Sequence, residues 1–273
     1  MERRSALALG AALLMVCTTV VPAAADADTV LITGANSGLG LEFVKQYAEK
    51  GWKVIATHRR DEMPETLAPI VEEYSNVHVE RMDVASVEEV RALAGKLDGE
   101  AIDVLINNAG IYSDRAACGD EACRGEDSSQ SFGQLDYELF DAIMAVNVRG
   151  PLLVSEAFIP NVRMSRQRKI VSISSTNGSV TFTLGGSGAI AYRASKAALN
   201  RAMQLVAVHE RDEGVTVLLL HPGAVLTERQ AHLTYPGMIH MQPSVAGMIE
   251  QIEKATIADT GRFIQYDGAT APW

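Results

Sequence analysis

The chain has 273 residues, of which 47% are hydrophobic and 21% are charged. This composition is that of a globular protein, and the length suits one large α/β domain. The net charge is −10, and the sequence contains no basic run and no basic stripe interleaved with aromatic residues. These features argue against nucleic acid or an anionic membrane surface as a partner.

Residues 1–25 are predicted to be a signal peptide. Glu2-Arg3-Arg4 precedes an apolar run from Ala6 to Val21, and Ala23-Ala24-Ala25 supplies an Ala-x-Ala cleavage site. The run is short for a bilayer span of about 20 residues. We therefore expect an exported protein, periplasmic or secreted, with no stable membrane insertion after cleavage. A membrane-anchored or cytoplasmic protein is the alternative, and residues 26–273 are predicted to form a single domain.

The first predicted strand, Thr29 to Ile32, leads directly into a glycine-rich turn. Gly34 suits the tight turn, Gly38 lets the backbone approach a pyrophosphate, and Gly40 lets the following helix pack on the strand. The helix, expected over 39–50, then presents its free N–H groups to the phosphates. The spacing is G-x-x-x-G-x-G rather than the common G-x-G-x-x-G. The predicted dinucleotide site comprises Gly34, Asn36, Ser37, Gly38, Leu39 and Gly40.

The end of the second predicted strand, 52–57, bears on the choice of cofactor. Dinucleotide-binding folds often place a carboxylate for the ribose about twenty residues beyond the glycines. Here the residues are His58, Arg59 and Arg60, and the first acid is Asp61. A cation at this place suits a 2′-phosphate. We therefore favour NADP(H) over NAD(H), with His58 and Arg59 in contact with it. The alternative is that Arg59 and Arg60 only begin a solvated loop.

Strand-like and helix-like segments continue to alternate along the chain. Strands are expected over 77–82, 102–106, 169–173, 215–220 and 262–265, and helices over 86–97, 135–160 (interrupted near 147–151), 192–213 and 243–258. This alternation predicts a Rossmann-type, doubly wound parallel sheet of about seven strands with helices on both faces.

Residues 112–134 are expected to form a polar loop. It carries Cys118 and Cys123, which in an oxidising compartment could close a small disulfide loop. Two free thiols are the alternative. A metal site is disfavoured because no His or further Cys lies nearby in the sequence, and we expect no bound metal.

Tyr192 and Lys196 are the candidate catalytic pair. Residues four apart lie on the same face of a helix, so the phenol and the ammonium can share a pocket. A nearby cation stabilises the phenolate and lowers the pKa of a tyrosine, which makes it a usable acid or base at neutral pH.

Taken in order, these motifs resemble the short-chain dehydrogenase/reductase family, classical type, over nearly all of residues 28–273. Asn107-Asn108-Ala109-Gly110, Ile173-Ser174-Ser175, Tyr192-x-x-x-Lys196 and Pro222-Gly223 match its motifs. Within the family, the chain is similar to the C-factor and sniffer-like carbonyl reductases. The catalytic residues that the resemblance implies are Asn147, Ser175, Tyr192 and Lys196. The interval from Ser175 to Tyr192 is roughly four residues longer than usual, which leaves Ser174 and Ser179 as rivals.

The resemblance also implies the remaining contacts to the cofactor. They fall on Asp83, Val84, Asn108, Ala109, Gly110, Tyr192, Lys196, Pro222, Gly223, Val225 and Thr227. For Asn107, a structural role is as well supported as a cofactor contact. The substrate lid is expected over 228–242, and the expected pocket walls are Ile111, Tyr112, Phe182, Met238 and Trp273.

The implied reaction is reversible hydride transfer between a nicotinamide and a carbonyl or secondary alcohol, with tyrosine as general acid/base. A nucleotide-binding signalling or sensor protein with little turnover is the alternative. A sugar-nucleotide epimerase or dehydratase is a third reading, and it usually needs a larger C-terminal substrate domain. The small-residue face Ala194, Ala197, Ala198 and Ala202 indicates either a homodimer or homotetramer, or burial within one subunit.

Overall fold

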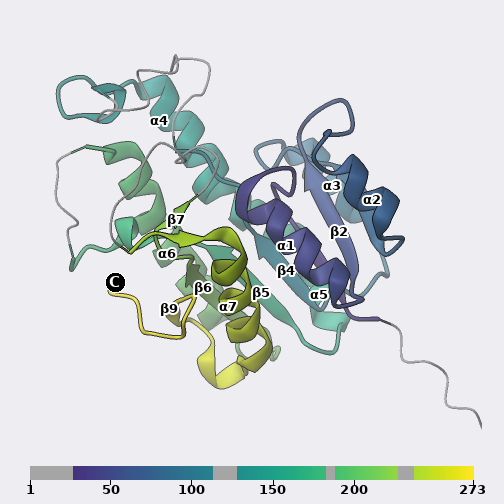
Figure 1. The fold of residues 1–273 in the computed structure, drawn as a ribbon. Helices are drawn as coiled ribbons and strands as arrows, with labels where there is room; N and C mark the ends of the chain where they lie inside the picture. Colours follow the sequence, from purple (N-terminus) through teal and green to yellow (C-terminus); the bar gives the residue numbers. More distant parts are fainter. Residues whose placement is uncertain (1–26, 113–127, 183–187, 227–236) are drawn as a thin grey trace, which may run out of the picture.

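The structure is a computed structural model that describes residues 27–112, 128–182, 188–226 and 237–273 (Figure 1). The predicted signal peptide, Cys118, Cys123 and Thr227 lie outside the described residues, as do residues 228–236 of the expected lid. The predictions for those residues stay predictions.

Seven parallel strands form the central sheet, in the order β3-β2-β1-β4-β5-β6-β9. Leu31 is aligned with Ile55 on one side and with Leu105 on the other. The strands are β1 (Thr29–Ile32), β2 (Lys53–His58), β3 (Val77–Arg81), β4 (Val104–Asn107), β5 (Lys169–Ile173), β6 (Thr216–His221) and β9 (Phe263–Gln265). The order reverses direction between β1 and β4, and a ligand of such a sheet binds at the carboxyl ends of the strands there. The predicted Rossmann-type fold is confirmed.

Two helical layers cover the sheet because alternate strand residues point to opposite faces. Ile32 packs with helices α1 (Gly38–Glu49) and α7 (Met241–Lys254), and the short helix α2 (Ala68–Glu73) adds Ile70 to the same cluster. Leu31 packs on the other face with helices α3 (Val87–Lys96), α5 (Gly150–Met164) and α6 (Ile190–Glu210). Figure 1 shows α1 and α7 together in front of the sheet. Each apolar strand is thus buried on both sides.

The expected interruption in the 135–160 helix is a π-helical segment, not a break. Helix α4 (Tyr137–Met144) runs into π-helical residues Ala145–Arg149 and then into α5. A π segment widens the turn by one residue and is frequent at functional sites. Here it places Asn147, which is fully buried, between the ends of β4 and α6. Tyr137–Met164 is long and apolar enough to cross a membrane, but Val154 and Phe158 pack in the core under the sheet.

Several expected boundaries are wrong by a few residues. Helix α7 ends at Lys254, not 258, because Thr256 and Asp259 form a capping box that starts a new 3₁₀ turn, Ile257–Asp259. Helix α2 and the two-stranded pair β7 (Val225–Leu226) with β8 (Ile239–His240) had no sequence prediction. In the predicted small-residue face of α6, Ala194 is exposed and the other three alanines are half-buried, so this face is not core.

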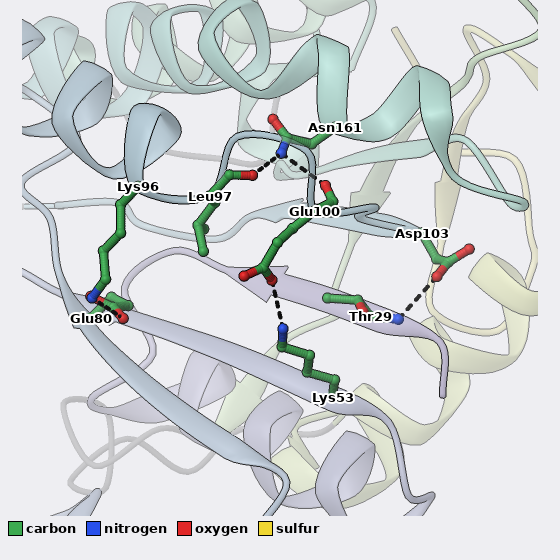
Figure 2. A network of polar contacts seen from close by, with 8 residues as sticks. All are labelled: Thr29, Lys53, Glu80, Lys96, Leu97, Glu100, Asp103 and Asn161. Carbon is green, nitrogen blue, oxygen red and sulfur yellow. Dashed lines mark hydrogen bonds and ion pairs between the residues drawn. The ribbon is translucent and has the colours of Figure 1, made fainter. Parts of the chain in front are cut away.

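The amino ends of the strands are held by a polar network, shown in Figure 2. An Asp103 carboxylate oxygen accepts from the Thr29 N–H at 3.0 Å, which joins β4 to β1. The Asn161 amide of α5 donates to the carbonyls of Leu97 and Glu100, at 2.6 and 2.8 Å. The glutamate also pairs with Lys53 of β2. Structural polar groups therefore occupy the edge of the sheet at the amino ends of the strands. The candidate active site lies at the opposite edge, at the carboxyl ends.

Candidate active site

The glycine-rich turn lies at the switch point between β1 and β4, and two of its glycines are required by close packing. A Cβ at Gly34 would lie 2.8 Å from Ala109 Cα, and one at Gly40 would lie 2.3 Å from Gly34 O. Gly38 differs because a Cβ there would meet nothing within 4 Å, although its φ of +55° is left-handed like the φ of +65° at Gly34. The turn therefore packs tightly on β4 and opens at Gly38, the position expected to face a pyrophosphate.

The segment after β4 braces this turn through hydrogen bonds. The Thr33 hydroxyl accepts from the N–H groups of Asn108 and Ala109, both at 3.0 Å. The Asn108 side chain donates to the carbonyls of Thr33 and Gly34, at 2.9 and 3.2 Å. Asn107 donates to the Ser155 hydroxyl of α5 at 3.0 Å, which is a structural contact. The Asn108 side chain thus stabilises the glycine-rich turn through two of its backbone carbonyls.

The first turn of α1 fits an anion. Ser37, at the N-cap, has an extended backbone and forms no side-chain cap, and the first turn holds no acidic residue. The leading N–H groups of a helix lack partners within the helix and carry partial positive charge, which favours a phosphate. The Asn36 carbonyl accepts from the Thr66 hydroxyl at 2.7 Å, which fixes the turn against the segment after β2.

The end of β2 carries positive charge. Arg59 and Arg60 are exposed, and neither forms an ion pair among the described residues. Arg81 of β3, by contrast, pairs with Asp61 at 3.1 Å and with Glu89 at 2.8 Å. Burial, followed by the charges of Arg60 and Arg81, lowers the pKa of His58. His58 is therefore neutral at pH 7, and the two exposed arginines carry the positive charge.

Asp83 and Val84, two of the predicted cofactor contacts, follow β3. One carboxylate oxygen of Asp83 accepts from the Ala85 N–H at 2.9 Å, and the Asp83 N–H donates to Glu89 at 2.8 Å. The Val84 side chain is buried, and a Cβ at Gly150 of α5 would come within 3.1 Å of it. Asp83 is half-buried, while the side chain of Val84 serves as core.

Tyr192 and Lys196 lie together in the first two turns of α6. The Lys196 Nζ lies 5.8 Å from the centroid of the Tyr192 ring and donates to the Ile173 carbonyl, at the end of β5, at 2.9 Å. Burial lowers the pKa of Lys196 to about 8, because desolvation disfavours the charged form. The lysine is still mostly protonated at pH 7, so its positive charge lies near the Tyr192 ring.

Asn147 joins this pair to the end of β4. Its side-chain oxygen accepts from the Ile111 N–H and its NH₂ donates to the Ile111 carbonyl, both at 2.9 Å, and the NH₂ also donates to the Ser195 hydroxyl at 3.0 Å. A Cβ at Gly110 would lie 3.4 Å from Asn147 Oδ1 and 3.8 Å from Lys196 Nζ. Gly110, Asn147 and Lys196 therefore meet in one place.

The three candidate serines differ in their partners. The Ser174 hydroxyl donates to the Asn200 side chain, and the Ser179 hydroxyl donates to the Trp273 carbonyl at 2.7 Å. The Ser175 hydroxyl accepts from the Asn177 N–H at 3.2 Å, and among the described residues it donates to none. Ser175 thus keeps a proton to offer a substrate oxygen, which its two rivals do not.

The 3₁₀ turn after Ser175, Thr176–Gly178, packs directly on α6. A Cβ at Gly178 would come within 2.6 Å of the Lys196 backbone. This contact requires glycine and brings the Ser175 segment to the same turn of α6 that carries the lysine.

The Pro222-Gly223 segment follows β6 at the same edge of the sheet. The Pro222 carbonyl accepts from the Ser244 hydroxyl of α7 at 2.6 Å. Gly223 has a φ of +84°, and a Cβ there would lie 3.0 Å from both Ile239 and Tyr266. Val225 pairs with Ile239 in the β7–β8 ladder. The tight packing fixes the backbone of this segment, where the resemblance implies contacts to the cofactor.

Some of the residues expected to line the substrate pocket expose apolar side chains to solvent. Tyr112 and Phe182 are 39% and 48% exposed, and the Tyr112 ring lies 4.8 Å from the Tyr192 ring, centroid to centroid. Ile111 and Met238 are half-buried. Trp273 is anchored: its ring packs on Phe263 and its carbonyl accepts from the N–H groups of Val180 and Thr181.

Sequence reasoning missed Gln130. Its side chain is fully buried and bonds the backbone of both Tyr112 and Tyr192. It belongs to no motif and lies in a segment that reads as a polar loop, so no sequence signal marks it.

Comparisons with known proteins agree with this geometry. Residues 28–235 match the model of the short chain dehydrogenase family. The chain is 35% identical to the protein named C-signal of Myxococcus xanthus over 187 residues, which covers 67% of this chain and 100% of that protein.

Two solved structures with similar folds are carbonyl reductases. The NADPH-bound carbonyl reductase from chicken fatty liver superposes with a TM-score of 0.80 at 27% identity, covering 91% of this chain and 100% of that one. The carbonyl reductase Sniffer of D. melanogaster gives a TM-score of 0.73 at 26% identity, covering 90% of this chain and 100% of that one.

Proposed function

Since this chain belongs to the short chain dehydrogenase family and is an NAD(P)-dependent oxidoreductase, we propose that it is an NADPH-dependent carbonyl reductase in which Tyr192 is the general acid. The placement of Tyr192 beside the Lys196 ammonium, at the end of the sheet where the glycine turn opens, carries this proposal. A nicotinamide bound at this edge of the sheet would supply the hydride.

Each catalytic side chain has a distinct task in this proposal. Ser175 donates a hydrogen bond to the substrate carbonyl oxygen, and Tyr192 gives that oxygen its proton as the bond is reduced. The ammonium of Lys196 stabilises the phenolate left behind. Asn147, through Ile111 and Ser195, holds α6 against the end of β4. In the oxidative direction the same groups take the proton from an alcohol.

The exposed arginines at the end of β2 support NADPH as the cofactor. The planar guanidinium of arginine suits a 2′-phosphate, and Arg59 and Arg60 have no competing carboxylate among the described residues. The chicken carbonyl reductase with the similar fold is NADPH-bound.

Two exposed aromatic side chains, Tyr112 beside Tyr192 and Phe182, support a hydrophobic carbonyl compound as the substrate. Tyr112 packs on the catalytic ring, and Phe182 lies in the segment that follows Ser175. Burial of apolar substrate area against such side chains contributes roughly 25 cal/mol per Å².

The test is loss of NADPH absorbance with a panel of aromatic and aliphatic aldehydes and ketones. Tyr192→Phe removes only the acidic hydroxyl, so kcat should fall about a thousandfold, while NADPH binding, measured by fluorescence, changes little. Tyr137→Phe is the matched control, because that side chain is 71% exposed on α4. An unchanged kcat in Tyr192→Phe would refute the assignment.

A signalling role is the second candidate, because the Myxococcus xanthus relative carries the name C-signal. The hydroxyl of Ser175 and the Tyr192–Lys196 pair weigh against it, since a protein that only binds a nucleotide needs no proton donor. Tight NADPH binding with no turnover on any member of the panel would favour this candidate instead.

A further inference from the structure

Gln130 links two segments that meet at the catalytic tyrosine. It ends the 3₁₀ turn Ser128–Gln130, and its side chain is fully buried. Its NH₂ donates to the Tyr112 carbonyl at 2.6 Å, and its oxygen accepts from the Tyr192 N–H at 3.0 Å. The orientation of the amide is fixed by these partners, because a carbonyl can only accept and a backbone N–H can only donate.

Helix α6 needs this acceptor. The residue before its first turn, Ala189, has a φ of +58° and offers no side-chain cap. The Tyr192 N–H is the third in the helix, one of the leading N–H groups that have no partner within it. A serine or aspartate at the N-cap usually serves such a group. Here the acceptor comes from Gln130, sixty-two residues earlier in the chain.

The NH₂ group of the Gln130 amide holds the backbone of Tyr112, whose ring packs on the ring of Tyr192. The Tyr112 and Tyr192 rings pack at 4.8 Å with planes tilted by 56°, a favourable aromatic geometry. One buried side chain therefore fixes the backbone of both tyrosines. A shift of either backbone moves the Tyr192 phenol relative to Lys196.

We propose that Gln130 is a positioning residue for the reaction. By forming hydrogen bonds to the backbones of both Tyr192 and Tyr112, it holds the Tyr192 phenol in its catalytic position. This inference rests on the proposed role of Tyr192 as general acid. The two hydrogen bonds described above join Gln130 to backbone atoms of Tyr112 and Tyr192, and not to the phenol oxygen. Gln130 acts on kcat through the tyrosine.

The first test is Gln130→Met, which keeps the length of the side chain and removes both hydrogen bonds. We expect kcat to fall about thirtyfold, since small displacements of a catalytic group cost rate steeply, with the Kd for NADPH changed less than twofold. Gln134→Met is the matched control, the same exchange at an exposed position four residues on, and it should match the wild type. Equal losses in kcat and in NADPH binding would indicate a structural defect and overturn the proposal.

The second test combines Gln130→Met with Tyr192→Phe. Because Gln130 acts only through the phenol hydroxyl, the double variant should be as slow as Tyr192→Phe alone. A further thirtyfold loss in the double variant would overturn the inference. A fully active Tyr192→Phe would instead overturn the proposed function. A slow Tyr192→Phe beside a wild-type Gln130→Met would refute the role of Gln130 alone.

Discussion

At the scale of the residue, Lys196 shows how function works against stability. Its ammonium is almost fully buried, and among the described residues its hydrogen bond goes to a neutral acceptor, the Ile173 carbonyl. Desolvation therefore penalises the charged form, and its pKa falls to about 8. In the proposed mechanism the site needs a cation beside a phenol, and burying that cation lowers the stability of the folded protein. This is an instance of the general trade-off between activity and stability.

We predict that Lys196→Met abolishes reduction but stabilises the cofactor-free protein at pH 7 by about 2 kcal/mol, the relief of desolvation minus one hydrogen bond. The folded-state pKa lies below the unfolded value, so wild-type stability rises between pH 8 and 10.5 as the folded state releases its proton first. The advantage of the variant should shrink over that window in urea titrations. Lys45→Met, at an exposed lysine of α1, is the control. A variant no more stable than wild type at pH 7 contradicts this account.

The charge at the end of β2 yields a second prediction at this scale. Arg59→Gln with Arg60→Gln should raise the KM for NADPH at least tenfold and leave the KM for NADH within twofold, because only NADPH carries the 2′-phosphate. Arg91→Gln, at an exposed arginine of α3, should change neither. Equal changes for the two cofactors would count against a phosphate contact.

At the scale of the element, the glycines of the turn from β1 to α1 are required for different physical reasons. Gly40 is required because helix α1 lies against the backbone of the turn. Gly38 is favoured by its φ of +55° alone, since a Cβ there would meet nothing within 4 Å. Sequence spacing alone assigns both to one motif.

These causes predict different outcomes for one exchange. Gly40→Ala should destabilise the protein by about 3 kcal/mol, because its Cβ overlaps rigid backbone. Gly38→Ala should lose about 1 kcal/mol to left-handed strain and also lose NADPH affinity. Gly99→Ala is the control, since Gly99 has a φ of +79° with open space away from the site. It should show the strain without the change in affinity. Thermal unfolding and NADPH titration measure both effects. If Gly38→Ala bound NADPH normally, the pyrophosphate would lie elsewhere.

At the scale of the whole molecule, the folded domain starts close to the predicted cleavage site. Strand β1 begins at Thr29, three residues after Asp26. Cleavage after Ala25 would thus leave the sheet intact. We propose export by the signal peptide, supported by its three-part composition.

Two measurements test export. Mass spectrometry of the protein from a periplasmic or culture fraction should give an N-terminus at Asp26. A variant starting at residue 26 should match the melting temperature and kcat of the purified mature protein. A full-length N-terminus on protein found only in spheroplasts would refute export.

Much of the fold and site follows from local sequence. Apolar strands of four to six residues between helical segments predict a parallel sheet. The glycine turn joins two consecutive elements, and Tyr192 and Lys196 lie on one helix, so both features depend on residues close together in the sequence. Periodicity and spacing fix such features because the interacting residues are neighbours in the chain.

Only the tertiary structure distinguishes Ser175 from Ser174 and Ser179, since the partners of the rival serines, Asn200 and Trp273, are remote in sequence. The same holds for Gln130, whose amide caps a helix sixty-two residues away. Hydrogen bonds between distant segments depend on how the layers pack, and a pattern along the chain does not record that packing. The sequence by itself thus determined the reaction class, and the packing of its layers decided which side chains are in place to support it.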